Sequence, residues 1–156
     1  MKPTNVTRLL DQRKIAYTAH QLPLEKLGAL EAARYLDVPA ELVFKTIVVK
    51  RVSAGKPILA LVPGTQEVNL KALAKVIGEK KVVLPTQREA EQITGLQAGG
   101  ISPLALLNRG FQVILDSSAE QYKEIYISGG QRGLDIQLPV SDLVSLTNAK
   151  VDEIST

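Results

Sequence analysis

Hydrophobic residues recur along the chain at two spacings, one typical of amphipathic helices and one typical of buried strands. Helical spacing with capping or stop signals predicts a helix beginning at Thr4 or Asn5 and further helices over residues 28–36, 70–77, 86–94 and 139–146. Apolar runs predict strands over residues 15–21, 43–50, 58–62, 82–84, 111–115, 125–127 and 134–138. The irregular order of these elements, with a hairpin turn at 53–57, predicts one α/β (α+β) domain over residues 1–156.

The strand VFKTIVVK, at residues 43–50, carries a lysine within an apolar run. Side chains alternate between the two faces of a strand, which puts Lys45 among β-branched residues and puts Phe44 and Thr46 on the opposite face. An unpaired ammonium group buried there would be costly. Two interpretations stay open. Either Lys45 lies at the start of the strand and extends its charge to water along its methylene stem, or this face opens onto a pocket and the lysine points at an anionic ligand.

Composition narrows the possible chemistry. The chain contains no cysteine and a single histidine, His20, which excludes disulfides, thiolate zinc sites, a cysteine nucleophile and a histidine-rich metal site. We therefore expect no metal and no cofactor. The net charge of +3 permits a phosphate-rich partner without requiring one.

The hydropathy of the chain argues against a membrane protein. There is no run of about 18 apolar residues that could cross a bilayer. The N-terminal segment MKPTNVTRLLDQRK is polar and lacks the apolar centre of a signal peptide. We therefore expect a cytoplasmic protein, and nothing in the sequence requires more than a monomer.

Two glycine-rich loops, at residues 95–103 and 128–133, interrupt the predicted strands and helices. Paired glycines let the backbone approach a ligand closely and direct its amides at an oxygen. Neither loop has the spacing of a Walker or dinucleotide motif, and each alone is also typical of an ordinary turn. Their length, together with the lysine on the apolar strand, favours a ligand-binding role.

Three motifs together resemble the YbaK/EbsC-type aminoacyl-tRNA deacylases: FKT at 44–46, GGISP at 99–103 and SGGQRGLDI at 128–136. The resemblance covers nearly the whole chain. It implies one domain with a mixed, mostly antiparallel, barrel-like sheet surrounded by helices. It also implies an enzyme that acts in trans on Cys-tRNA(Pro), the product of mischarging by prolyl-tRNA synthetase, because discrimination by size between cysteine and proline is limited. Mischarged tRNA(Pro) is the implied partner, and prolyl-tRNA synthetase is a further one.

The resemblance assigns roles to individual residues. The implied catalytic residues are Lys45, Gly99, Gly100, Ser102, Ser128 and Asp135. The implied substrate-binding residues are His20, Phe44, Thr46, Ile101, Pro103, Gly129, Gly130 and Arg132. Lys45 would hold the 3′ end of the tRNA, and the loop at 99–103 would surround the ester. Asp135 either acts on the substrate amine or orders the adjacent loop, and His20 either lies near the pocket or simply ends a strand.

The family's proposed mechanism suits a chain with few nucleophiles. The thiol of the bound cysteine attacks its own carbonyl, while the enzyme orients the substrate and supplies amides near residues 99–101 to the developing oxyanion. The only base partners that the sequence offers Ser128 are Lys45 and Asp135. Leu22 and Leu96 stand where many relatives carry tyrosine, so Ala-tRNA(Pro), or a broader range of aminoacyl-tRNAs, stays an alternative substrate.

Two other interpretations of the function stay open. The chain could be a module that binds tRNA or a synthetase without catalysis, or an enzyme that forms a Schiff base through Lys45.

Several cations gather around the predicted helix at 70–77: Lys71, Lys75, Lys80, Lys81 and Arg88. They form either a path for the phosphates of the acceptor stem or an ordinary solvated surface.

Overall fold

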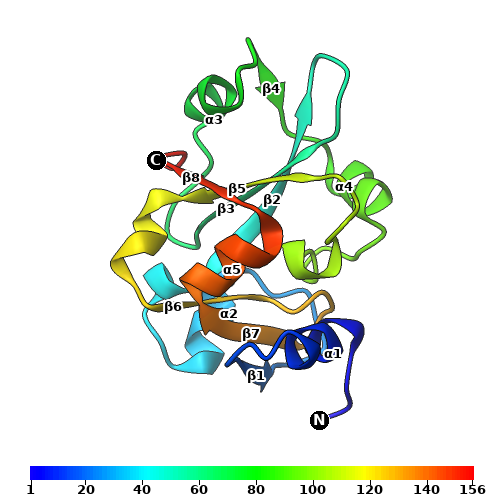
Figure 1. The fold of residues 1–156 in the computed structure, drawn as a ribbon, viewed down its shortest axis with the longest axis vertical. Coiled ribbons are helices and arrows are strands. Elements are labelled where there is room, and N and C mark those ends of the chain that lie inside the picture. The colour runs from blue at the N-terminus through cyan, green and yellow to red at the C-terminus, as the bar shows by residue number, and fades with distance from the viewer.

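The computed structural model describes residues 1–156 and contains two β-sheets (Figure 1). The strands are β1 (Thr18–Gln21), β2 (Phe44–Arg51), β3 (Ile58–Pro63), β4 (Val82–Val83), β5 (Gln112–Asp116), β6 (Glu124–Ser128), β7 (Leu134–Pro139) and β8 (Lys150–Asp152). One sheet is three-stranded and antiparallel, in the order β1-β7-β6. The other is five-stranded and mixed, in the order β4-β2-β3-β5-β8, with β5 parallel to both of its neighbours. The predicted α/β class and the β2–β3 hairpin are confirmed.

Five helices pack around the sheets. They are α1 (Asn5–Gln12), α2 (Ala29–Leu36), α3 (Leu70–Ile77), α4 (Gln87–Thr94) and α5 (Val140–Thr147). None of them has both the length and the apolar character that a membrane crossing requires.

Local capping signals determine where several helices begin. The amide of Glu89 donates to Thr86 Oγ1 at 3.2 Å, and the amide of Thr86 donates to Glu89 Oε1 at 3.0 Å, which completes the predicted capping box of α4. The amide of Ala72 donates to Asn69 Oδ1 at 3.0 Å at the start of α3. These bonds satisfy amides that have no partner within the helix.

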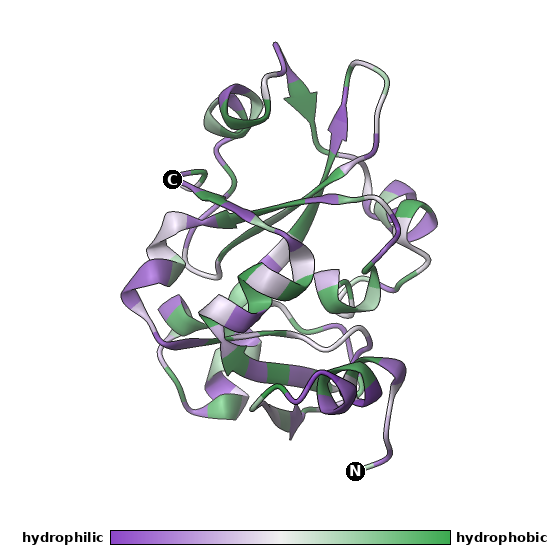
Figure 2. Cartoon of the chain, viewed as in Figure 1, coloured by the Kyte–Doolittle hydropathy of each residue, from purple (hydrophilic) through white to green (hydrophobic).

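The two sheets share a hydrophobic core of 18 buried residues. Phe44 and Val48 of β2 enter it from the five-stranded sheet, and Ile127 and Ile136 enter it from the three-stranded one. Val49, on the opposite face of β2, belongs to a second core beneath α3. The predicted alternation along β2 is therefore confirmed. Figure 2 shows hydrophobic residues along much of the central strands, while the surrounding helices carry both hydrophobic and hydrophilic residues.

The expectation of a barrel-like sheet is wrong, because the strands form two separate sheets and not a closed barrel. The five-stranded sheet ends in two very short edge strands, β4 and β8, which leave little backbone for further pairing. Hydrogen-bonded pairing between the sheets is limited to an isolated bridge between Val43 and Tyr126. The sheets are held together mainly by the side chains of the shared core.

Two other sequence predictions require correction. The strand expected over residues 15–21 begins only at Thr18, because Lys14 adopts a left-handed conformation (φ +56°) and the amide of Ile15 donates to Leu10 O at the end of α1. The strand β8 was not predicted at all. Its three residues pair in parallel with β5 and carry no run of apolar residues by which a strand could be recognised.

Candidate active site

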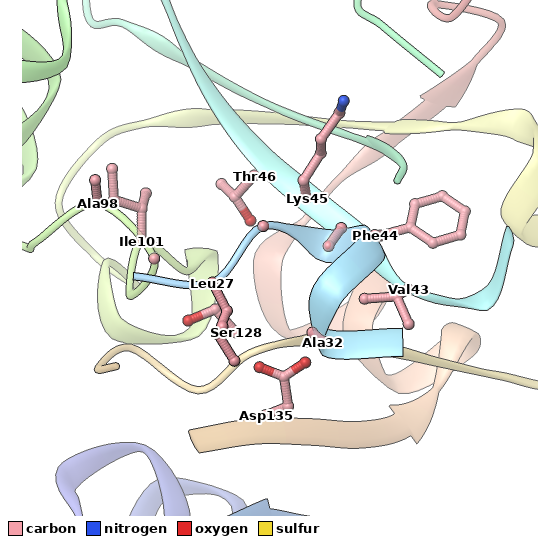
Figure 3. A pocket seen from close by; sticks show the side chains of 13 residues that line it. Leu27, Ala32, Val43, Phe44, Lys45, Thr46, Ala98, Ile101, Ser128 and Asp135 are labelled. Atoms are coloured by element: carbon pink, nitrogen blue, oxygen red, sulfur yellow. The ribbon is translucent and has the colours of Figure 1, made fainter. Parts of the chain in front are cut away.

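A cavity of about 230 Å³ opens where both sheets meet the start of α2 (Figure 3). Its walls are formed by Leu27, Gly28, Ala29, Ala32, Val43, Phe44, Lys45, Thr46, Ala98, Gly99, Ile101, Ser128 and Asp135. Seven of these residues belong to the predicted site: Phe44, Lys45, Thr46, Gly99, Ile101, Ser128 and Asp135. The fold therefore brings the β2 motif and both glycine-rich loops to one place.

Asp135 supplies a buried carboxylate to this cavity. It lies directly opposite Ser128 in the β6–β7 pair, so both side chains project from the same face of the sheet, and Asp135 points toward the cavity in Figure 3. Only 9% of the residue is exposed. Burial raises the pKa of Asp135 to about 6, and the charge of nearby His20 acts in the opposite direction. At neutral pH the cavity therefore contains a carboxylate that would gain from a cationic partner.

Lys45 combines features of both interpretations of its strand position. It is the second residue of β2, and its stem lines the cavity while its ammonium group points away from it (Figure 3). Lys45 Nζ donates to Glu67 Oε1 at 3.0 Å, and the two side chains are 23% and 81% exposed. The charge thus reaches the surface at the rim of a pocket.

The adjacent residue, Thr46, places a hydroxyl group in the wall of the cavity. Thr46 Oγ1 is buried and has no hydrogen-bond partner in the protein. A buried polar group without a partner is costly, by about 1–3 kcal/mol. Such a group at the edge of a cavity is available to a ligand.

The two glycine-rich loops contact one another. A Cβ atom added to Gly100 would lie 2.8 Å from the Cα atom of Gln131, so the backbones approach as closely as they do only because this position is glycine. Arg132 Nε donates to Ala98 O at 2.8 Å and joins the loops a second time. We expect the loops to be positioned as a unit.

The amides of the first loop differ in their availability. The amide of Gly100 already donates to Gln97 O at 2.8 Å, whereas those of Gly99 and Ile101 make no backbone hydrogen bond. Gly99 and Ile101 also line the cavity, and Gly99 has a φ of +88°. A pair of amides for an oxyanion would therefore come from Gly99 and Ile101, not from Gly100.

Two residues of the GGISP motif lie behind the cavity wall. Ser102 is fully buried, and its Oγ accepts a hydrogen bond from the amide of Leu104 at 3.1 Å at the start of a short 3₁₀ turn. Pro103 is the first residue of that turn and is also buried. The contacts seen for both residues fix the backbone that follows Ile101. Their predicted roles at the substrate stay predictions.

The remaining predicted residues surround the site at a greater distance. Gly129 and Gly130 line a neighbouring hollow next to Val6, at the start of α1. His20 lies on β1 opposite Asp135, shares a hydrogen bond of 2.9 Å between its Nε2 and Gln137 Oε1, and packs against Tyr126 with ring centroids 5.5 Å apart. His20 thus lies beside Asp135 without lining the cavity.

The sequence analysis missed the wall formed by the start of α2. Gly28 is the residue before the helix, and no side chain accepts a hydrogen bond from the amides of its first turn. The free amides carry the partial positive charge of the helix terminus to the edge of the cavity. The available signal was the concentration of glycine and alanine in GALEAA at 28–33, at Gly28, Ala29, Ala32 and Ala33, because such small residues leave space for a ligand.

Elsewhere, the cations predicted to follow the acceptor stem are all exposed: Lys71, Lys75, Lys80, Lys81 and Arg88. Exposure is common to both interpretations of this surface, so the phosphate path stays a prediction. No group of three or more His, Cys, Asp or Glu side chains lies close enough together to hold a metal ion.

Comparison with known proteins relates the cavity to a family. A sequence profile described as the aminoacyl-tRNA editing domain matches residues 26–146, which contain every residue that lines the cavity. A protein of Enterococcus faecalis, EbsC, is named as a candidate Cys-tRNA(Pro)/Cys-tRNA(Cys) deacylase. It is 36% identical over 155 residues, which cover 98% of this chain and 93% of that protein.

More distant similarities involve larger enzymes and solved structures. A proline–tRNA ligase of Thermodesulfovibrio yellowstonii is 33% identical over 109 residues, which are 69% of this chain and 18% of that enzyme. A crystal structure described as a candidate trans-editing enzyme for prolyl-tRNA synthetase superposes with a TM-score of 0.83. At 22% identity it covers 99% of both chains and shows that the fold is shared.

Proposed function

The chain belongs to the aminoacyl-tRNA editing domain family, and on that premise we propose that it is a trans-acting deacylase that hydrolyses Cys-tRNA(Pro). The observation that carries the proposal is the convergence of Lys45, Ser128, Asp135 and the loop at 99–101 on one small cavity. The name of the E. faecalis relative supports cysteine as the amino acid. Similarity to proline–tRNA ligases supports tRNA(Pro) as its carrier and prolyl-tRNA synthetase as a partner.

The cavity suits an aminoacyl ester of small size. Its volume of about 230 Å³ is below the roughly 300–1,000 Å³ of pockets that enclose drug-sized ligands. Asp135 would accept hydrogen bonds from the α-ammonium group, and the free amides of Gly99 and Ile101 would donate to the ester oxygen as it gains charge. Lys45, at the rim, would bind the phosphate or ribose of the terminal nucleotide.

The cleavage itself would use the substrate's own thiol. Sulfur attacks the ester carbonyl and forms a C–S bond, the C–O bond to the ribose breaks, and the thiol proton passes to the departing ribose oxygen. The product is a four-membered thiolactone that water opens. The site is compatible with this route, because Ser128 Oγ makes no hydrogen bond to Lys45 or Asp135 that would activate it as a nucleophile. Its one hydrogen bond is accepted from the amide of Gly130 at 3.3 Å, and Lys45 Nζ is paired with Glu67.

Amino-acid preference would depend on the walls next to the substrate side chain. Leu22 packs against the small cluster of Ala32, Ala33 and Val43, and two members of that cluster, Ala32 and Val43, line the cavity. Leu96 instead packs on the main core and lines the neighbouring hollow beside α1. Of the two positions that depart from many relatives, Leu22 is therefore the one placed to influence specificity through its contacts.

The decisive experiment is deacylation of Cys-, Ala-, Ser- and Pro-tRNA(Pro) by the wild type and by Lys45→Ala. We expect rapid loss of Cys-tRNA(Pro) that depends on Lys45, and poor cleavage of Ser-tRNA(Pro), because a hydroxyl is a weaker nucleophile than a thiol. Equal rates for the serine and cysteine esters would exclude the thiol route. Preferential loss of Ala-tRNA(Pro) would show that the enzyme prefers the alanyl ester to the cysteinyl ester. Binding of tRNA without any deacylation would identify a binding module.

A further inference from the structure

The ammonium group of Lys45 has a partner that belongs to none of the motifs. Glu67 lies in the connection between β3 and α3, four residues beyond the end of β3. Its Oε1 accepts the hydrogen bond from Lys45 Nζ at 3.0 Å, and its side chain is 81% exposed. Glu67 does not line the cavity. A negative charge is thus paired with the one cation among the residues that line the cavity.

The backbone of Glu67 is held in place although its side chain is exposed. Its amide donates to Thr156 O at 3.2 Å and its carbonyl accepts from the amide of Thr156 at 2.9 Å. Two residues further on, the amide of Asn69 donates to Ile154 O at 2.7 Å. The amide of Ile154 in turn donates to Asp116 Oδ1, at 2.9 Å, and Asp116 is buried. The fold therefore fixes the backbone from which the Glu67 carboxylate reaches Lys45.

We propose that Glu67 is a positioning residue that serves as an exchangeable counter-ion for Lys45. It holds the ammonium group at the rim, pointing away from the cavity, until a phosphate at the 3′ end of the tRNA replaces it. This proposal rests on the proposed function. It goes further by assigning to Glu67 a control over how readily the nucleic acid enters.

The strength of the ion pair suits an exchange. An exposed carboxylate–ammonium pair contributes little, because water and salt screen it. A phosphate diester competes for the same ammonium donors, and it is repelled by the carboxylate that it displaces. Glu67 should therefore weaken association with tRNA. It should leave the reaction of the bound ester unchanged, because it does not reach the cavity.

The test compares Glu67→Gln with Glu120→Gln, which removes the same charge from another exposed position that forms no ion pair with lysine or arginine. With Cys-tRNA(Pro) as substrate, Glu67→Gln should lower KM by about two- to fivefold, the range that an exposed ion pair provides. The value of kcat should stay near that of the wild type. Glu67→Asp, which keeps the charge, should stay closer to the wild type than Glu67→Gln.

Equilibrium binding of uncharged tRNA(Pro) provides a readout that needs no catalysis. Glu67→Gln should tighten the Kd in the wild-type background, but in Lys45→Ala it should change the Kd no more than Glu120→Gln does. An equal tightening in both backgrounds, or a loss of kcat in Glu67→Gln, would overturn the proposal. If the wild type deacylates no aminoacyl-tRNA, the proposed function fails instead, which is a separate outcome.

Discussion

At the scale of single residues, Asp135 links the site to the stability of the protein. Its pKa rises from the ordinary 3.8 to about 6 on folding, because burial disfavours the carboxylate. Between about pH 4 and pH 6 the folded state therefore binds a proton more tightly than the unfolded state. The contribution of this group to stability is fully present below that window and is lost as the pH rises through it. At neutral pH Asp135 is a destabilising charge.

Asp135→Asn should consequently stabilise the protein at pH 7, by about 1–3 kcal/mol, and much less at pH 4. The measurement is urea denaturation at both pH values. Asp152→Asn, the same chemical change at an exposed position, is the matched control. A gain at pH 4 equal to that at pH 7 would show that the carboxylate is not the cause.

The same substitution should impair deacylation. In the wild type, kcat/KM for Cys-tRNA(Pro) should rise as Asp135 ionises near pH 6, because only the carboxylate can pair with the substrate's ammonium group. That acidic limb should be absent from the profile of Asp135→Asn. A residue kept for a charge that destabilises the fold is expected at a functional site.

Whether the sequence alone could identify a residue of the site depends on whether that residue lies within a recognisable motif. Lys45, Thr46 and Asp135 were found because they lie within motifs of a recognisable family. Glu67 was not found, because no feature of the β3–α3 connection indicates that it returns to the start of β2. Nor could spacing reveal that the amide of Gly100 is already engaged. Motifs identify residues, whereas pairings across the fold depend on three-dimensional register.

At the scale of elements, the contact between the two glycine-rich loops separates two roles for Arg132. The family resemblance implies a substrate-binding role, which for a guanidinium group could be a contact with a tRNA phosphate. In the structure, Arg132 Nε instead donates a hydrogen bond to Ala98 O. If Arg132 chiefly joins the loops, Arg132→Ala should displace the amides of Gly99 and Ile101. It should then lower kcat by about tenfold to a hundredfold, with little change in KM.

Steady-state kinetics at two salt concentrations distinguish these roles. Arg109→Ala removes the same charge from an exposed position and is the control. A rise in KM that shrinks at high salt, with kcat intact, would favour the phosphate contact instead. The melting temperature of Arg132→Ala should stay close to that of the wild type, which separates loss of alignment from loss of folding.

The elements themselves were predictable where local signals exist. Helices α3 and α4 begin directly after Asn69 and Thr86, whose side chains cap them, and the β2–β3 hairpin follows from two apolar runs around a turn. The strand β8 and the true start of β1 were not predictable. The first depends on pairing with β5, and the second depends on how the end of α1 is closed. Both are decided by contacts that local sequence does not describe.

At the scale of the whole molecule, the absence of a closed barrel raises the question of whether the sheets unfold together. They share one core, with Phe44 and Leu61 entering from one sheet and Ile127 and Leu138 from the other. Because each sheet would expose its half of that core if it separated, we expect a single cooperative transition. The prediction of one domain over residues 1–156 would then hold in solution.

Thermal or urea unfolding followed by far-UV circular dichroism and by tyrosine fluorescence should give coincident curves. The four tyrosines are the natural probe, since the chain contains no tryptophan. Ile127→Ala, which empties a fully buried position, should lower the free energy of unfolding by about 2–5 kcal/mol and shift both curves equally. Two separated transitions would identify the sheets as independent units.

The placement of the cavity also has a consequence for folding during translation. Its walls are drawn from residues as far apart as Leu27 and Asp135, so no early portion of the chain holds a working pocket. During synthesis on the ribosome, a nascent chain that ends before β7 lacks Asp135 and therefore part of the cavity wall. The chain can bind its substrate only after β7 has left the ribosomal exit tunnel and paired with β1 and β6. A truncated polypeptide released before that point would lack deacylase activity.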